Sequence, residues 1–181
     1  MDQRRIVCVF GSARTLRKSP AWQQAYYLGQ QLARQGWTVV NGGYDGTMAA
    51  VSQGAREAGG YVIGVTCAVF DPLRPNLWLS EERKTSSLIE RMEVLASLGD
   101  AFVALPGGIG TLAEVTLVWN LLQIGVMSPR PLILIGPMWA RLMDVFTRYT
   151  EMGETVAALA WLANDVDEAV RALDQARRAA S

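Results

Sequence analysis

The sequence predicts an α/β fold: a Rossmann-like, doubly wound parallel sheet in a single domain over residues 1–181. Short apolar segments alternate with longer helical segments, which is the order of βαβ units. Glycine-rich turns follow three of the apolar segments, at Gly11-Ser12, Gly42-Gly43 and Gly107-Gly108. Because ligands of such sheets bind beyond the carboxyl ends of the strands, the three turns are predicted to converge on one pocket.

The first three strands are predicted from continuous apolar runs, which suit parallel strands covered on both faces. These runs cover residues 5–10, 37–40 and 61–65. The first connecting helix is predicted over residues 20–34, with Ser19 as its N-cap and Pro20 at its first position. The second helix opens at the glycine-rich turn after residue 41 and continues to about residue 58.

The second half of the chain begins differently, because residues 70–84 contain two prolines and a run of charges. This segment is predicted to be an irregular loop or lid. Two further strands are predicted over residues 101–105 and 131–135, with helices over 86–98, 115–125, 138–149 and from a capping box at 165–168 to about 179. The helix over 115–125 is apolar enough to be buried. The pattern leaves open whether residues 155–162 contain a sixth strand.

The charge and hydropathy of the chain argue against two kinds of partner, nucleic acids and membranes. Lys+Arg and Asp+Glu both number 17, and this balance predicts no nucleic-acid polymer as a partner. No uninterrupted apolar run reaches membrane-spanning length, and no signal sequence is recognisable, so we expect a cytoplasmic protein without a membrane partner. Cys8 and Cys67 lie in apolar runs and are predicted to be buried thiols.

The composition also excludes several kinds of catalysis. The chain has no histidine, which excludes Ser-His-Asp and Cys-His catalysis and the usual zinc sites. Its lysines are Lys18 and Lys84, and both lie in polar stretches without apolar neighbours to desolvate them. A Schiff base with pyridoxal phosphate is therefore disfavoured, and we expect neither a metal nor a cofactor.

The most informative stretch is Pro106-Gly107-Gly108-Ile109-Gly110-Thr111-Leu112-Ala113-Glu114, between an apolar strand and an apolar helix. The backbone N–H groups from Gly107 to Thr111 are predicted to hold a phosphate at the positive end of the helix dipole. Glu114 is expected in the first turn of the helix, with its carboxylate close to the ligand. A carboxylate beside a phosphate site indicates chemistry on a phosphorylated small molecule, most simply a nucleotide.

Gly42, Gly43 and Gly46 form a second glycine-rich turn, and together with Ser12 they are candidate nucleotide-binding residues. Neither turn has the G-x-G-x-x-G spacing of dinucleotide sites, and neither is followed by a Walker lysine. Each turn alone is equally well explained as a tight connection without a ligand. Two of them in one small domain favour the binding of a phosphate or a ribose.

Glu114 and Arg91 are the candidate catalytic residues, and each also has a structural interpretation. Glu114 can simply stabilise the helix dipole, although its apolar neighbours make an unpartnered carboxylate costly. Arg91 lies beside the apolar stripe of its predicted helix, so it can be solvated, pair with a neighbouring glutamate, or reach the pocket to bind an anion. The sequence pattern leaves these alternatives open.

The nine residues from Pro106 to Glu114 resemble the PGGxGTxxE signature of the LOG ("Lonely guy") family, long labelled "possible lysine decarboxylase". Further matches are Gly11-Ser12, Gly42-Gly43-x-x-Gly46-x-Met48, Ala58-Gly59-Gly60-x-Val62-x-Gly64-Val65, Arg91 and Gln123-Ile124-Gly125. The resemblance covers nearly the whole chain. It departs at Met92, where the family has lysine, and at Ala113 and Leu117, where the family has acids.

The resemblance implies a Rossmann-like homodimer that hydrolyses the N-glycosidic bond of a nucleoside 5′-monophosphate. The products are the free base and ribose 5-phosphate, and the associated substrates are AMP and cytokinin ribotides. It also implies a catalytic role for Glu114 and Arg91. Two alternatives remain: a nucleotide-binding or sensing module without catalysis, and a carrier of another phosphorylated or anionic cofactor.

Overall fold

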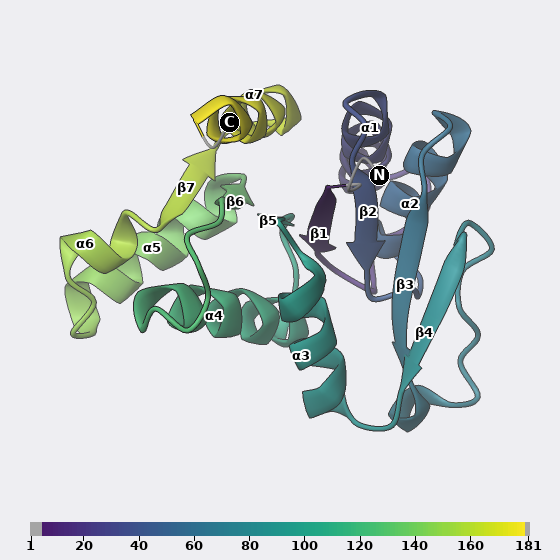
Figure 1. Ribbon diagram of the computed structural model, residues 1–181, viewed down its shortest axis with the longest axis horizontal. Helices are drawn as coiled ribbons and strands as arrows, with labels where there is room; N and C mark the ends of the chain where they lie inside the picture. The colour runs from purple at the N-terminus through teal and green to yellow at the C-terminus, as the bar shows by residue number, and fades with distance from the viewer. Residues whose placement is uncertain (1–4, 180–181) are drawn as a thin grey trace.

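The computed structural model describes residues 5–179, which form a seven-stranded sheet with helices on both faces (Figure 1). Every strand pairing is parallel, and the strand order is β4-β3-β2-β1-β5-β6-β7. The strands are β1 (Ile6–Phe10), β2 (Thr38–Asn41), β3 (Val62–Cys67), β4 (Glu81–Thr85), β5 (Ala101–Ala104), β6 (Leu132–Ile135) and β7 (Ala160–Ala163). The predicted doubly wound parallel sheet is confirmed.

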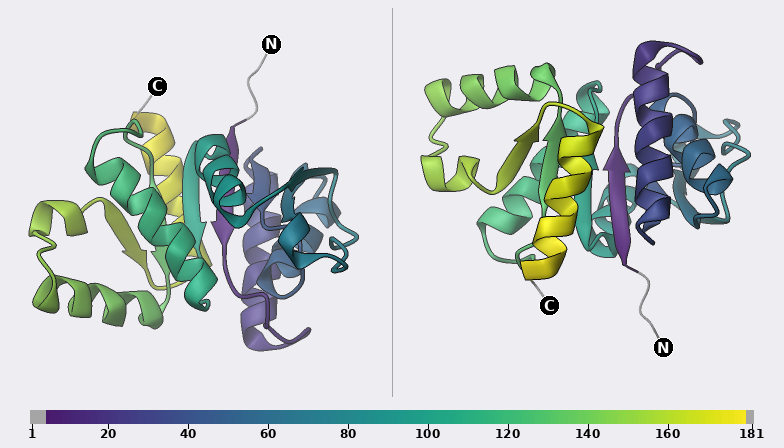
Figure 2. Two further views of the ribbon diagram at one scale, coloured as in Figure 1. Left: turned by 90° about the horizontal axis from the view of Figure 1, so that it is seen from below. Right: turned by 90° about the horizontal axis from the view of Figure 1, so that it is seen from above.

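The helices lie in the connections between strands and cover both faces of the sheet (Figure 2). Helices α1 (Pro20–Arg34), α2 (Thr47–Glu57) and α7 (Val166–Ala179) cover one face. The other face is covered by α3 (Leu88–Leu98), α4 (Ile109–Gln123), α5 (Pro137–Tyr149) and the short α6 (Glu154–Ala157). A single 3-10 turn, η1 (Ala68–Phe70), follows β3.

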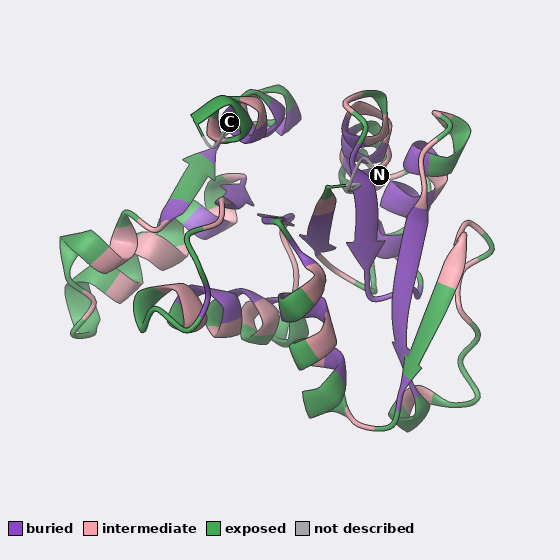
Figure 3. Ribbon diagram, viewed as in Figure 1, coloured by how far each residue is buried: buried purple, intermediate pink, exposed green. Residues whose placement is uncertain are grey.

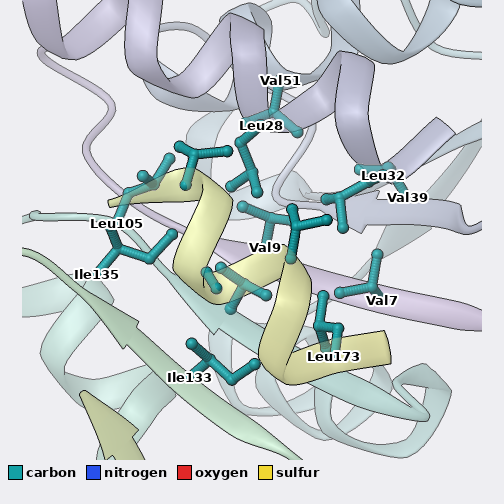
Figure 4. Packing of buried hydrophobic residues seen from close by; sticks show 14 of the residues in the cluster. Val7, Val9, Leu28, Leu32, Val39, Val51, Leu105, Ile133, Ile135 and Leu173 are labelled. Carbon is teal, nitrogen blue, oxygen red and sulfur yellow. The ribbon is translucent and has the colours of Figure 1, made fainter. Parts of the chain in front are cut away.

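The apolar strands supply both layers of the core, because successive side chains point to opposite faces. In β1, Val9 packs with the helices of the first face, whereas Cys8 packs with those of the second. Figure 4 shows the first layer, in which Leu28 of α1 and Leu173 of α7 pack with Val9. Both cysteines are buried free thiols, as predicted.

Strand β4 was not predicted, because its sequence is almost entirely charged. It covers the end of the segment that the sequence assigned to an irregular loop, extends one residue beyond it, and pairs with β3 at the edge of the sheet. Its side chains are largely exposed (Figure 3) and neutralise charges nearby: Glu81 pairs with Arg83, and Lys84 pairs with Asp71. Charged side chains are common on edge strands, where they oppose further pairing. Residues 71–80 form the irregular part of this segment.

Helix α4 begins earlier than predicted, at Ile109 with Gly108 as its N-cap. Glu114 therefore lies in the second turn and not in the first, so that expectation is wrong. The helix is also only partly buried: its buried residues are Thr111, Val115, Val118 and Trp119. The remaining apolar residues of this helix are half-buried or exposed because only one side of it packs on the sheet.

The question left open for residues 155–162 is answered by two short elements. Helix α6 ends at Ala157, and β7 then pairs with β6 at the second edge of the sheet. Across residues 5–179, no helix has both the length and the apolar character needed to span a bilayer.

Candidate active site

A cavity of about 560 Å³ lies at the point where the chain changes direction across the sheet. β1 has β2 on one side and β5 on the other, and the connections after β1, β2 and β5 leave the same edge. The turns after β1, β2 and β5 all contribute residues to the cavity, as predicted from the three glycine-rich sequences. A smaller cavity of about 290 Å³ lies between β7 and α7 and contains none of these turns.

The turn after β1 is fastened to the start of α2. The carbonyl of Ser12 accepts hydrogen bonds from the Thr47 N–H at 2.8 Å and from the Thr47 hydroxyl at 3.1 Å. The Ser12 hydroxyl accepts one from the N–H of Arg14 at 3.0 Å. Gly11, Ser12 and Arg14 all line the cavity. The turn is thus held by hydrogen bonds and places Arg14 at the border of the cavity.

The turn after β2 is built on a buried asparagine. Asn41 accepts a hydrogen bond from the Gly43 N–H at 2.8 Å and donates one to the Ser52 hydroxyl at 2.9 Å. Gly43 and Gly46 have positive φ angles of 78° and 70°, which glycine adopts without strain. They shape the turn beside the cavity, whereas Gly42 lies in the cavity lining.

The motif after β5 places the N-terminus of α4 at the cavity. Gly108, Ile109, Gly110 and Thr111 line it, and Thr111 is itself buried. The first N–H groups of a helix have no intrahelical acceptor, and no side chain caps this helix. These groups therefore provide a site for an anion. Gly107 is not among the lining residues, and a Cβ there would be 2.1 Å from the Thr111 hydroxyl oxygen.

Arg91 and Glu114 form a buried ion pair in the same cavity. Nη1 of Arg91 lies 3.3 Å from Oε1 of Glu114, and the two side chains are 7% and 13% exposed. Nε of Arg91 donates to the carbonyl of Val65 at 2.8 Å. Of the three interpretations of Arg91, the structure therefore shows the one in which it reaches the pocket, and there it pairs with Glu114 from α4.

Two aromatic rings lie near the charge of Arg91, and burial changes the pKa of Glu114. The guanidinium carbon of Arg91 lies 6.0 Å and 5.9 Å from the ring centres of Tyr44 and Phe70, within the range of cation–π attraction. Burial raises the pKa of Glu114 from its ordinary value to about 7, and the lowering effect of Arg91 does not offset this. Glu114 therefore exchanges its proton near neutral pH, which suits a group that takes part in proton transfer.

The rest of the cavity wall was missed by sequence reasoning. It is largely apolar and includes Tyr44, Met48, Phe70 and Leu73. Tyr44 is fixed by its hydroxyl, which donates to the Cys67 carbonyl at 3.0 Å and accepts from the Cys67 N–H at 2.9 Å. Phe70 and Leu73 come from the segment predicted as a loop or lid. This segment follows β3, and a loop after a strand of such a sheet is a place where ligand-binding residues are expected.

A model of the SLOG cluster4 family matches residues 4–128, which include every residue that lines the cavity. The chain belongs to this family. A Mycobacterium marinum protein named cytokinin riboside 5′-monophosphate phosphoribohydrolase is 30% identical over 138 residues, covering 71% of this chain and 68% of that protein. A rice protein (Oryza sativa subsp. japonica) with the same name, qualified as probable, is 38% identical over 124 residues, covering 67% and 55%. Membership of the LOG family is thus confirmed.

The alignments with these LOG proteins span between about half and two thirds of their length. A solved structure matches over more of both chains: the molybdenum cofactor carrier protein of Chlamydomonas reinhardtii. It is 28% identical with a TM-score of 0.76, and the match covers 97% of this chain and 99% of the carrier. Proteins with different named functions therefore share this fold.

This LOG-family chain departs from the family's sequence at Met92, Ala113 and Leu117. These three residues lie outside the cavity lining. Ala113 is exposed on α4, and Met92 and Leu117 are half-buried. Within residues 5–179, the charged groups that line the cavity are Arg14, Arg91 and Glu114. The departures thus leave the Arg91–Glu114 pair in place.

Proposed function

We propose that this protein hydrolyses the N-glycosidic bond of a nucleoside 5′-monophosphate of the AMP or cytokinin ribotide type, to free base and ribose 5-phosphate. The observation that carries the proposal is the position of Glu114, a buried carboxylate that lines the same cavity as the N-terminus of its own helix. Helix α4 therefore supplies both an anion site and a titratable carboxylate to the same cavity, where one ligand can contact both. The names of the LOG relatives support the same activity.

The helix rise supports a specific placement of the substrate. Glu114 lies four residues beyond Gly110 in the sequence, about 6 Å along the helix axis. A phosphate on the N–H groups of Ile109, Gly110 and Thr111 therefore leaves the ribose near the carboxylate. The apolar wall formed by Met48 and Phe70 then borders the base.

The chemistry requires a group that stabilises positive charge on the sugar. As the C1′–N bond breaks, the ribose acquires oxocarbenium character, which a nearby carboxylate stabilises. Ionised Glu114 also orients a water molecule and accepts its proton as the oxygen bonds to C1′. Glu114 then releases this proton to solvent and the departing base takes one up from solvent, so the overall reaction adds one water and Glu114 returns to its ionised form. Arg91 holds the carboxylate in place and stabilises its ionised form.

The decisive experiment measures base release by chromatography from AMP, N6-isopentenyl AMP and the matching nucleosides without phosphate. The proposal expects release from the monophosphates and a loss of at least about 100-fold in E114Q, which keeps the shape of the side chain and removes its charge. Equal rates for wild type and E114Q would refute the role of Glu114. Tight AMP binding without base release would instead indicate a nucleotide-binding or sensing module.

The second candidate is a carrier of a phosphorylated cofactor, favoured by the end-to-end match with the Chlamydomonas carrier. The same anion site at α4 and the apolar wall would then hold the cofactor. Equilibrium binding of molybdenum cofactor and of AMP to the same preparation separates the candidates. Tight cofactor binding that AMP does not displace, without base release, would favour the carrier.

We also propose a homodimer in the cytoplasm, where nucleoside monophosphates are present. Ile89 on α3 and Ile124 and Val126 after α4 are 70%, 58% and 74% exposed, and each is a candidate for burial in a dimer. Light scattering during size-exclusion chromatography checks the oligomeric state. Ile89→Glu should shift the mass from dimer to monomer, whereas Leu16→Glu, at an exposed leucine on the turn before α1, should not.

A further inference from the structure

The helix N-terminus and the Arg91–Glu114 pair supply less positive charge than is needed to balance the negative charge of a bound phosphate. A phosphate monoester carries a charge of about −1.5 to −2 at pH 7, and a helix N-terminus supplies about +0.5. Arg91 and Glu114 cancel one another when both are charged. While Glu114 is ionised, about 1 to 1.5 negative charges on the ligand therefore remain uncompensated by these groups.

Arg14 is the remaining charged residue of the lining among residues 5–179. It is exposed, and it makes no ion pair with any other residue in that range. Its backbone N–H is held by the Ser12 hydroxyl, so the side chain projects from a fixed point. Arg17 and Lys18, which follow closely in the sequence, do not line the cavity.

The turn of Arg14 and the anion site at α4 follow neighbouring strands. Its turn follows β1, and the motif that opens α4 follows β5, the strand paired with β1 through Phe10 and Ala104. The guanidinium of Arg91 lies against Gly42 after β2, the Val65 carbonyl of β3 and the Glu114 carboxylate of α4, so it is already engaged by groups of the protein. Arg14 and the first residues of α4 line the same cavity, so a phosphate at the start of α4 lies in the cavity that Arg14 borders.

We infer that Arg14 binds the 5′-phosphate of the ligand and so determines the preference for phosphorylated over unphosphorylated nucleosides. The inference builds on the proposed function, since it assumes a nucleoside monophosphate in the cavity. The planar guanidinium can donate two parallel hydrogen bonds to phosphate oxygens. Arg14 is a binding residue, and the chemistry at C1′ stays with Glu114.

The test compares dissociation constants for AMP and adenosine, measured by calorimetry on wild type, Arg14→Gln and Arg17→Gln. Because the wild-type protein is proposed to release base from AMP, all three proteins also carry E114Q in this titration, and chromatography confirms that AMP stays intact. Arg17→Gln is the matched control, because it removes an equal charge three residues away, outside the cavity lining. We expect Arg14→Gln to weaken AMP binding about tenfold or more and to leave adenosine binding unchanged, whereas Arg17→Gln changes neither.

Three results would overturn the inference. The first is AMP binding by Arg14→Gln at wild-type affinity, and the second is an equal loss in Arg17→Gln, which would indicate only long-range attraction. The third is a wild-type protein that binds AMP no more tightly than adenosine. Base release is scored separately: its absence, together with AMP binding that depends on Arg14, refutes the proposed hydrolysis and leaves the role of Arg14 standing. Thermal unfolding verifies that both variants are folded.

Discussion

The guanidinium of Arg91 occupies the space that a side chain at position 42 would fill. A Cβ on Gly42 would stand 1.8 Å from Nη2 of Arg91 and 2.6 Å from the sulfur of Met48. The glycine of the second turn therefore has a role beyond allowing the backbone to bend. It makes room for the arginine that pairs with Glu114.

Gly42→Ala should displace Arg91 and lower the rate of base release about tenfold or more, because small shifts of a catalytic pair reduce its efficiency strongly. The measurement is the rate with saturating AMP. Gly153→Ala is the control, since a Cβ at that glycine meets no atom within 4 Å. Full activity in Gly42→Ala would show that the position of Arg91 does not matter for turnover.

Base release should increase as the pH rises through about 7. Burial raises the pKa of Glu114 to about 7, and the mechanism requires its ionised form. Below that pH most molecules carry a protonated, inactive carboxyl group, and above it the rate should level off. A pH–rate profile from 5 to 9, at saturating AMP, is the check. A rate that falls through this range would contradict the assignment of Glu114 as the ionised group.

Stability should show the opposite trend through the same group. In the folded protein Glu114 keeps its proton up to about pH 7, whereas in the unfolded chain it loses the proton near its ordinary value of 4.5. The folded state thus binds more protons between these values, so the free energy of unfolding falls as the pH rises through this interval. Denaturant unfolding of wild type and E114Q should differ in this slope, with the steeper decline in wild type.

Arg91→Met should destabilise the fold by about 3 kcal/mol, because it leaves Glu114 buried without its partner. The double variant Arg91→Met/E114Q should recover part of this loss, since no unpaired charge remains. Urea unfolding of wild type, both single variants and the double variant gives the coupling energy. Additive effects of the two changes would mean that the pair contributes nothing to stability.

The sequence predicts most of the sheet but only part of the site, for physical reasons. Continuous apolar runs identify β1, β2, β3, β5 and β6, because strands covered on both faces need apolar residues at every position. β4 escapes this rule, since an edge strand has only one neighbour and tolerates Glu82 and Lys84 in contact with water. Its pairing with β3 depends on backbone hydrogen bonds that the side-chain pattern does not reveal.

Arg91 illustrates what the helix pattern misses. Leu88, Met92 and Leu95 form the apolar stripe of its helix, and their spacing predicts a side that faces the core. In the structure, however, Leu88 is 43% exposed and Arg91 is buried. The partner that permits this burial, Glu114, lies 23 residues away on another helix. Local periodicity therefore locates the helix correctly but does not determine which of its faces carries a buried ion pair.

The direction change at β1 has a consequence for how the protein folds and responds to ligand. Residues up to 98 form strands β1 to β4 and supply Arg14, Gly42 and Arg91 to the cavity, whereas residues after 100 form β5 to β7 and supply α4 with Glu114. The cavity lies where these two halves of the sheet meet. A ligand in the cavity thus contacts both halves of the sheet at once. Its binding energy opposes their separation, in addition to the pairing of β1 with β5 and the packing of the helices on these strands.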